Sequence, residues 1–245
     1  MAESRKVTSS PVATPIRTIQ TSKQHFELKI NGRTIRSAET SQVAILEAAT
    51  EEFATHGFCG ARVDTIALRA KTNKRMLYHY FTDKSGLYVA VLERVFEKIL
   101  VAENGLNLSS KEPIEGLREL VLFLWNYFLS HQEFVLILSS ENQLKAQYIK
   151  QSKKIPLIHA HFAEGLSDVI RRGCEKGVFR ADVDPVQIHL TILSMSFYYI
   201  NNQHTIAVNF KQDLFSPEMV QSWGEHMVAT TLAAVMFPGV ATPGG

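Results

Sequence analysis

The chain has 245 residues, of which 45% are hydrophobic and 20% are charged, and its formal net charge is +2. This composition excludes a disordered or collagen-like chain, and the length allows a sizeable core without covalent crosslinks. Two cysteines exclude a disulfide framework and favour a reducing compartment. The first 20 residues lack the apolar stretch of a signal peptide, and the longest apolar run, at 120–129, is about half a membrane span. We therefore expect a cytoplasmic protein with no membrane contact.

Positive charge gathers at the N-terminal end. Residues 1–84 carry 13 Lys and Arg against 8 Asp and Glu, a balance of +5, whereas residues 85–245 have a balance of −3. A basic segment joined to an acidic remainder favours contact between one end of the chain and a polyanion. A charge of this size also fits an ordinary solvated surface, and a motif is needed to decide.

Residues 1–39 predict a flexible N-terminal extension. Residues 1–19 are rich in Ser, Thr and Ala and have no periodic apolar face. Apolar residues alternate at 26, 28 and 30 before Asn31-Gly32, a pattern that predicts a short hairpin, which would be marginal in isolation. Arg33 and Arg36 follow, and they fit either a minor-groove DNA arm or a solvated tail.

Three helices are predicted between residues 40 and 84. The first starts at Thr40 or Ser41 and ends at Gly57, a residue suited to a positive φ. The second covers 63–70, and the third runs to residue 81 after Asn73, whose side chain can cap the amides that follow. Residues 71–73 form the three-residue connection that a helix-turn-helix unit requires.

The remainder predicts long helices with short breaks. Their expected spans are 83–104, 113–130, 132–146, 155–177, 184–210 and 216–236. Pro113, Pro156, Pro185 and Pro217 lie near four of the starts, where a missing backbone donor does little harm. Beyond the hairpin we find no alternating β-branched run, and the predicted fold class is all-α.

The third helix has the composition of a DNA-reading helix. Lys74 and Arg75 lie in its first turn, where the positive end of the helix dipole disfavours cations. A structural helix would favour acids there, whereas a DNA-reading helix gains contacts to phosphate and guanine. Tyr78, His79 and Tyr80 then offer rings and hydroxyls to phosphate, sugar or thymine methyl groups.

Residues 41–90 resemble the TetR family of bacterial transcriptional repressors. The matching runs are Ile45-Leu46-Glu47-Ala48-Ala49 with Phe53, Gly57-Phe58, Val63-Asp64, Ile66-Ala67, Asn73 to Phe81, Lys84 and Leu87. The following segment, including 131–134, is similar to RutR-type members of that family. The resemblance implies an N-terminal helix-turn-helix domain at 40–84 and a C-terminal helical bundle at 85–245 that binds a ligand and dimerises.

The resemblance also implies DNA contacts. By analogy with the family, Tyr78 and Lys84 contact phosphates, while neighbouring residues face base edges or nearby backbone. The predicted DNA-binding residues are Arg36, Arg62, Asn73, Lys74, Arg75, Met76, Tyr78, His79, Tyr80 and Lys84. Two positions depart from the family pattern: Lys71 replaces the usual turn glycine, and Ala61-Arg62 replaces a hydroxyl at the start of the second helix.

The C-terminal half carries two further sets of predicted site residues. An apolar effector cavity is implied between its helices, with the helix at 83–104 linking it to the DNA-binding unit. The predicted cavity residues are Trp125, Asn126, Phe128, His161, Phe162, Met195, Tyr198 and Tyr199. The last two long helices are expected to form the homodimer interface through Phe197, Ile200, Asn201, Met219, Trp223, Met227, Thr230 and Ala234.

Catalytic and metal-binding patterns are weak. His159 and His161 are two residues apart, which places them on nearly opposite faces of a helix. Cys59 and Cys174 have no local catalytic signature, and no nucleophile elbow, zincin helix or Walker loop occurs. We expect no metal, no cofactor and no enzymatic activity.

The resulting hypothesis is a dimeric repressor that a small-molecule effector releases from a palindromic DNA operator. Two alternatives stay open. The first is a corepressor-dependent regulator or an activator. The second is a helical small-molecule-binding protein whose DNA-binding unit has degenerated, a hypothesis that the departures at Lys71 and Arg62 keep open.

Overall fold

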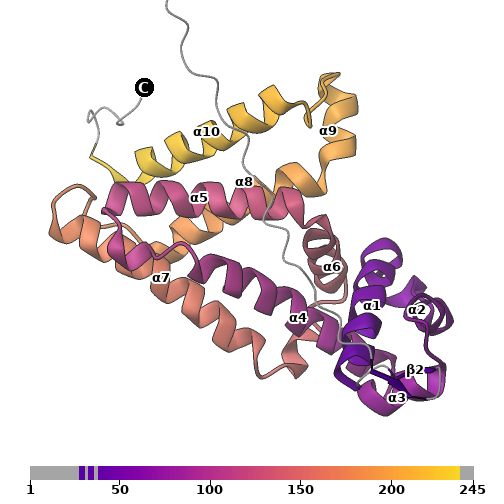
Figure 1. Ribbon diagram of the computed structural model, residues 1–245. Helices are drawn as coiled ribbons and strands as arrows, with labels where there is room; N and C mark the ends of the chain where they lie inside the picture. The colour runs from indigo at the N-terminus through magenta and orange to yellow at the C-terminus, as the bar shows by residue number, and fades with distance from the viewer. Residues whose placement is uncertain (1–27, 31–32, 36–37, 238–245) are drawn as a thin grey trace, which may run out of the picture. The chain divides into compact units, whose positions relative to one another are not determined.

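A computed structural model describes residues 28–30, 33–35 and 38–237, in two units divided between Ser37 and Ala38 (Figure 1). In the first unit, β1 (Leu28–Ile30) and β2 (Arg33–Ile35) pair antiparallel. The predicted hairpin is therefore present. Its turn at 31–32 and the candidate Arg36 lie outside the described residues.

The second unit begins with α1 (Ala38–Gly60), α2 (Val63–Arg69) and α3 (Lys74–Phe81). The predicted start of the first helix at Thr40 or Ser41 is wrong by two or three residues, because Ala38 and Glu39 extend it and an acid suits a helix N-terminus. The predicted break at Gly57 is confirmed by its φ of 62° and ψ of 178°, although one further turn follows it.

Seven helices continue the described chain, and they confirm the all-α fold class of this unit. They are α4 (Lys84–Asn104), α5 (Pro113–Ser130), α6 (Gln132–Gln143), α7 (Ile155–Glu175), α8 (Pro185–Asn201), α9 (Gln203–Phe210) and α10 (Pro217–Val235). Two 3₁₀ turns, Leu108–Ser110 and Ile149–Gln151, lie between them. Proline occupies one of the first two positions of α5, α7, α8 and α10, as predicted.

The predicted helix at 132–146 ends early, at Gln143. Lys145 and Ala146 adopt φ values of 57° and 58°, which are incompatible with a right-handed helix. The buried carboxylate of Glu141 accepts hydrogen bonds from the backbone N–H groups of residues 148 and 149, at 2.6 and 2.9 Å, and stabilises this sharp turn.

The predicted helix at 184–210 is two helices, α8 and α9, separated at Asn202. This residue has φ −108° and ψ 12°, and its side-chain amide donates to the Tyr198 carbonyl at 3.0 Å. Local hydrogen bonding by an asparagine side chain competes with the helical pattern, which explains the break.

One hydrophobic core runs through the second unit, and two helices connect its ends. α4 packs against α1 and α3 and also against α5 and α7, while α6 lies along α1. The hydroxyl of Tyr88 on α4 donates to the Ile137 carbonyl on α6 at 3.4 Å, and the Phe58 N–H on α1 donates to Ser140 Oγ at 3.4 Å. Figure 1 shows α1 to α3 gathered at one end of this unit, with α4 and α6 leading from them to the other helices.

Within the part of the chain that the structure describes, none of the helices is by itself long and apolar enough to span a membrane. α5 and α6 reach that length only as a pair bent by 87°.

Candidate nucleic-acid interface and ligand cavity

The turn between α2 and α3 has the geometry of a helix-turn-helix unit. Asn73 caps α3 as predicted, since its Oδ1 accepts from the Met76 N–H at 2.9 Å. Lys71 adopts a φ of 52°, the conformation for which glycine is best suited. A non-glycine residue there costs about 1 kcal/mol. The turn forms nonetheless, because the Thr72 N–H donates to the Ala67 carbonyl at 2.9 Å.

α3 has one buried anchor and a broad exposed face. Leu77 is completely buried and fixes the rotation of the helix against the core. Tyr80 is half-buried and its ring packs against Phe81. The predicted DNA-binding residues that remain exposed on α3 are Lys74, Arg75, Met76, Tyr78 and His79.

Two of the predicted cations already have partners. Lys74 Nζ lies 2.7 Å from Asp64 Oδ1 on α2, and this hydrogen bond raises the pKa of Lys74. Lys84 Nζ lies 4.9 Å above the Phe58 ring and 3.5 Å from the Cys59 carbonyl oxygen. The lysines are thereby positioned beside α3, at either end of it.

The start of α2 is held by a residue that the sequence reasoning missed. Arg62 precedes the helix, its side chain is exposed, and it provides no side-chain cap. Its backbone N–H instead donates at 3.0 Å to Oε1 of Glu52, a buried α1 carboxylate that also lies 3.6 Å from Arg69 of α2. Glu52 thus ties α1 to both ends of α2, and no local spacing rule would have identified it.

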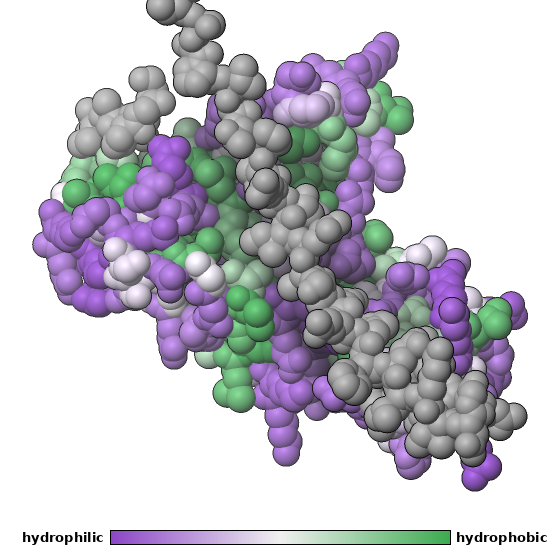
Figure 2. Space-filling model, in the orientation of Figure 1, coloured by the Kyte–Doolittle hydropathy of each residue, from purple (hydrophilic) through white to green (hydrophobic). Residues whose placement is uncertain are grey.

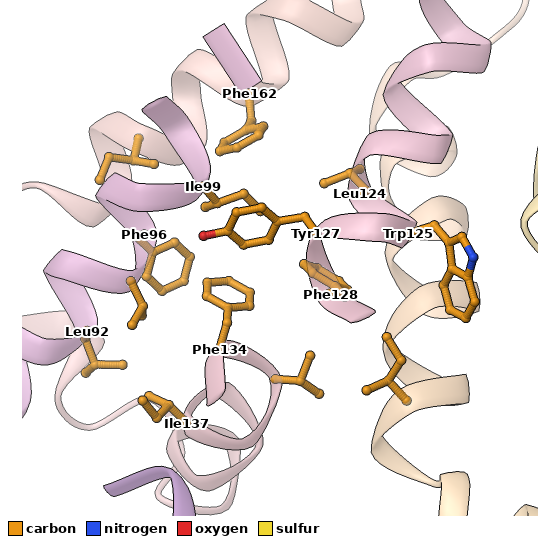
Figure 3. Packing of buried hydrophobic residues seen from close by; sticks show 14 of the residues in the cluster. Leu92, Phe96, Ile99, Leu124, Trp125, Tyr127, Phe128, Phe134, Ile137 and Phe162 are labelled. Carbon is orange, nitrogen blue, oxygen red and sulfur yellow. The ribbon is translucent and has the colours of Figure 1, made fainter. Parts of the chain in front are cut away.

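A mainly apolar cavity lies among α4, α5, α6, α7 and α8. Its inner part has a volume of about 60 Å³, and a wider outer part between α7 and α8 has about 220 Å³. Both parts are lined by His159 and His189. Figure 3 shows the aromatic side chains of the inner wall drawn together from four helices, and they are Phe96, Phe128, Phe134 and Phe162.

Two of the eight predicted ligand residues, Phe128 and Phe162, line this cavity. Trp125 points away from it in Figure 3 and donates to the Val220 carbonyl of α10 at 3.1 Å. Tyr199 packs edge-on against Trp125 and donates to the Leu214 carbonyl at 2.7 Å. These two rings join α5, α8 and α10 and lie outside the cavity.

The other four predicted ligand residues are also elsewhere. Asn126 is exposed and borders a shallow surface groove beside His131. His161 is exposed and pairs with Asn104 at 2.9 Å. Tyr198 is 62% exposed, and Met195 is half-buried against the core without lining the cavity.

The cavity's two histidines were missed as ligand candidates. Partial burial lowers the pKa of both His159 and His189, and each imidazole is therefore neutral at pH 7. Their signal in the sequence was helical spacing, because His159 lies three residues before Phe162 and His189 four residues before Leu193. Both therefore share a face with apolar cavity residues.

The predicted dimer residues divide between surface and interior. Ile200 and Met227 are buried inside the protomer, whereas Asn201 is exposed. The remaining five are half-buried: Phe197, Met219, Trp223, Thr230 and Ala234. α8 also exposes an apolar stripe that was not predicted, formed by Val186, Leu190 and Tyr198. Figure 2 shows further hydrophobic surface around α9, at the upper right, where Val208 and Phe210 are 76% and 69% exposed.

Two family models cover most of the second unit. Residues 45–91 match the family described as "Bacterial regulatory proteins, tetR family", and residues 113–231 match "Tetracyclin repressor-like, C-terminal domain". The two matches include α2 and α3 with their connecting turn, and the helices that surround most of the cavity.

Similar proteins agree with these matches. The chain is 34% identical to the HTH-type transcriptional repressor NicS of Pseudomonas putida, over 81% of this chain and 93% of NicS. It is 28% identical to the HTH-type transcriptional repressor SCO4008 of Streptomyces coelicolor, over 66% of this chain and 79% of that protein. The crystal structure of the transcriptional regulator SCO4942 from S. coelicolor shares the fold, with a TM-score of 0.61 and 24% identity over 80% of this chain and 98% of that chain. The chain therefore belongs to the tetR family of bacterial regulatory proteins and is a DNA-binding transcriptional regulator.

Proposed function

We propose that this regulator is a homodimeric repressor that a small-molecule effector releases from a palindromic operator. The observation that carries the proposal is the exposed cationic and aromatic face of α3, fixed by the buried Leu77, on a unit that α4 and α6 connect to the cavity. The division into a DNA-binding domain at 40–84 and a ligand-binding and dimerisation domain at 85–245 belongs to the same proposal.

α3 enters the major groove of the operator. Arg75 and His79 are exposed, lie four residues apart and therefore share one face of the helix, which suits contact with base edges. Tyr78 and Lys84 bind phosphates on either side, and Lys74 exchanges Asp64 for a phosphate when DNA binds. Contacts of the last kind position the protein without reading sequence.

Two copies are needed because a palindromic operator presents two half-sites. The exposed apolar stripe of α8, with Phe197 and the half-buried residues of α10, supports a face at which a second copy docks. Burial of Leu190 and Tyr198, which are 57% and 62% exposed in the single chain, would contribute to its stability.

The effector acts by a shift between two populations. A ligand that fits the cavity better in one conformation favours that conformation in proportion to its differential affinity. α4 is suited to transmit the change, because Phe96 and Ile99 line the cavity while Lys84 lies at its other end beside α3. The protein acts by binding alone, with no catalytic step, and in the cytoplasm, where bacterial DNA is accessible.

Genome-wide mapping of the DNA bound by the protein, followed by affinity titration on the enriched site, tests the function. A palindromic site bound by two copies, with affinity that falls when effector is added, is the expected result. Affinity that rises with effector identifies a corepressor-dependent regulator. The absence of any enriched sequence favours a small-molecule-binding protein with a degenerate DNA-binding unit.

A further inference from the structure

The cavity is chemically two-sided. Its inner part is lined by Phe96, Phe128, Phe134 and Phe162 together with aliphatic side chains, whereas its polar groups gather where the inner and outer parts meet. His159 from α7 and His189 from α8 lie at that junction, and the His159 ring is 5.1 Å from the Phe96 ring. A ligand that fits both parts needs an apolar end and a polar end.

The size of the cavity limits the apolar end. A site that accommodates one benzene ring has a volume of about 150 Å³. The inner part, at about 60 Å³, is smaller than this, and the outer part, at about 220 Å³, is larger. One six-membered ring therefore fits across the junction with its edge among the phenylalanines, and a fused polycyclic ligand does not fit without rearrangement. Flat rings also stack favourably against phenylalanine rings.

The lining selects the charge of the polar end. Among the described residues that line the two parts, His159 and His189 are the only titratable side chains. With no carboxylate in the lining, a cationic ligand would lack a counter-charge. A carboxylate can accept an N–H hydrogen bond from each imidazole, and its negative charge favours protonation of either ring. It also stays near solvent, because His159 keeps part of its surface open, and this limits the cost of desolvation.

We propose that the effector is a small single-ring aromatic acid. Its ring lies against Phe96, Phe128 and Phe162, and its carboxylate binds between His159 and His189. This inference rests on the proposed function in one respect, which is that the cavity is the effector site. The ligand class itself follows from the lining and can be tested without DNA.

Isothermal titration calorimetry of the full-length protein with a defined panel tests the ligand class. The acids are benzoate, the three monohydroxybenzoates and phenylacetate, each compared with its neutral amide, and cyclohexanecarboxylate replaces the flat ring. At least one aromatic acid should bind with a dissociation constant below about 1 mM. Its amide should bind about tenfold more weakly, because the charged hydrogen bonds are lost. Cyclohexanecarboxylate should also bind more weakly, because it cannot stack.

Two variants and a matched control locate the polar end. His159→Gln and His189→Gln each remove an imidazole while keeping a polar side chain, and each should weaken binding of the acid about tenfold while hardly changing binding of the amide. His204→Gln changes an exposed histidine on α9 that does not line the cavity, and should leave acid binding unchanged. Circular dichroism melting curves confirm that the variants are folded.

Equal binding of acid and amide, or no binding by any acid in the panel, would overturn the proposal. So would loss of acid binding in His204→Gln equal to that in His159→Gln. An acid that binds in the cavity without changing operator affinity leaves the ligand class standing and contradicts the proposed effector role. A non-aromatic molecule that releases the operator contradicts the ligand class and leaves the proposed function standing.

Discussion

The ion pair between Lys74 and Asp64 lies at the edge of the proposed DNA interface and gives a prediction with a definite sign. Lys74 Nζ is 2.7 Å from Asp64 Oδ1, and the two side chains are 50% and 76% exposed. If Lys74 binds a phosphate, it must first leave Asp64, whose own charge also repels DNA. Asp64→Asn removes both obstacles and keeps the size of the side chain.

The expected gain is modest because the pair is exposed. Exposed ion pairs typically correspond to a factor of about 1.4 to 5 in an equilibrium constant, and operator affinity should rise by a factor in that range. The gain should shrink as salt increases from about 0.1 M to 1 M, because the Debye length falls from about 10 Å to 3 Å. In a Lys74→Ala background only the direct repulsion between Asp64 and DNA is left, and the gain should be smaller.

Fluorescence anisotropy titrations on the mapped operator at several salt concentrations measure this effect. Glu175→Gln is a matched control, since it breaks an exposed 2.7 Å ion pair with Arg171 on α7 and changes the net charge equally. That control should leave operator affinity unchanged. Weaker binding by Asp64→Asn, together with unchanged binding by Lys74→Ala, would show that the first turn of α3 does not meet DNA.

Three other changes test different parts of the structure. Lys84→Ala should make the slope of log affinity against log salt less negative by about 0.9, and Tyr78→Phe should weaken binding to all DNA sequences alike; unchanged gel-shift titrations for both would exclude the phosphate contacts. Gly57→Ala should lower the free energy of unfolding in urea by about 1–3 kcal/mol, because a φ of 62° with a ψ of 178° is almost restricted to glycine, and equal stability would contradict that backbone geometry. Burial raises the pKa of Glu103 above its ordinary 4.5, so the folded state holds the proton more tightly and loses stability as pH rises through the folded pKa. Glu103→Gln should therefore raise the melting temperature at pH 8 and change little near pH 4; a lower melting temperature at pH 8 would mean that the charged carboxylate is stabilising.

Local patterns predicted the DNA-binding unit well because its geometry depends on near neighbours in the chain. The cap at Asn73 and the buried position of Leu77 both follow from spacing within a few residues. The contact from Glu52 to Arg62 depends instead on how α1 crosses α2, and the pairing of Lys74 with Asp64 depends on the angle between α2 and α3. Spacing along one helix contains neither angle.

The cavity residues were harder to predict because every helix of a bundle carries apolar side chains on more than one face. Trp125 and Phe128 are three residues apart on α5, yet one packs against α10 and the other lines the cavity. Periodicity shows that both are buried and cannot say which neighbouring helix each one meets. The break at Asn202 escaped for a related reason, since a single side-chain hydrogen bond overrides an otherwise continuous helical pattern.

The arrangement of two copies on one operator tests the central claim most directly. A crystal or cryo-electron-microscopy structure of the protein with its mapped operator should place the α3 helices of two copies in successive major grooves, about 34 Å apart. Arg75 and His79 should face base edges, and Lys84 should contact phosphate. A complex in which α3 lies away from the duplex, or in which no twofold axis relates two copies, would contradict the account.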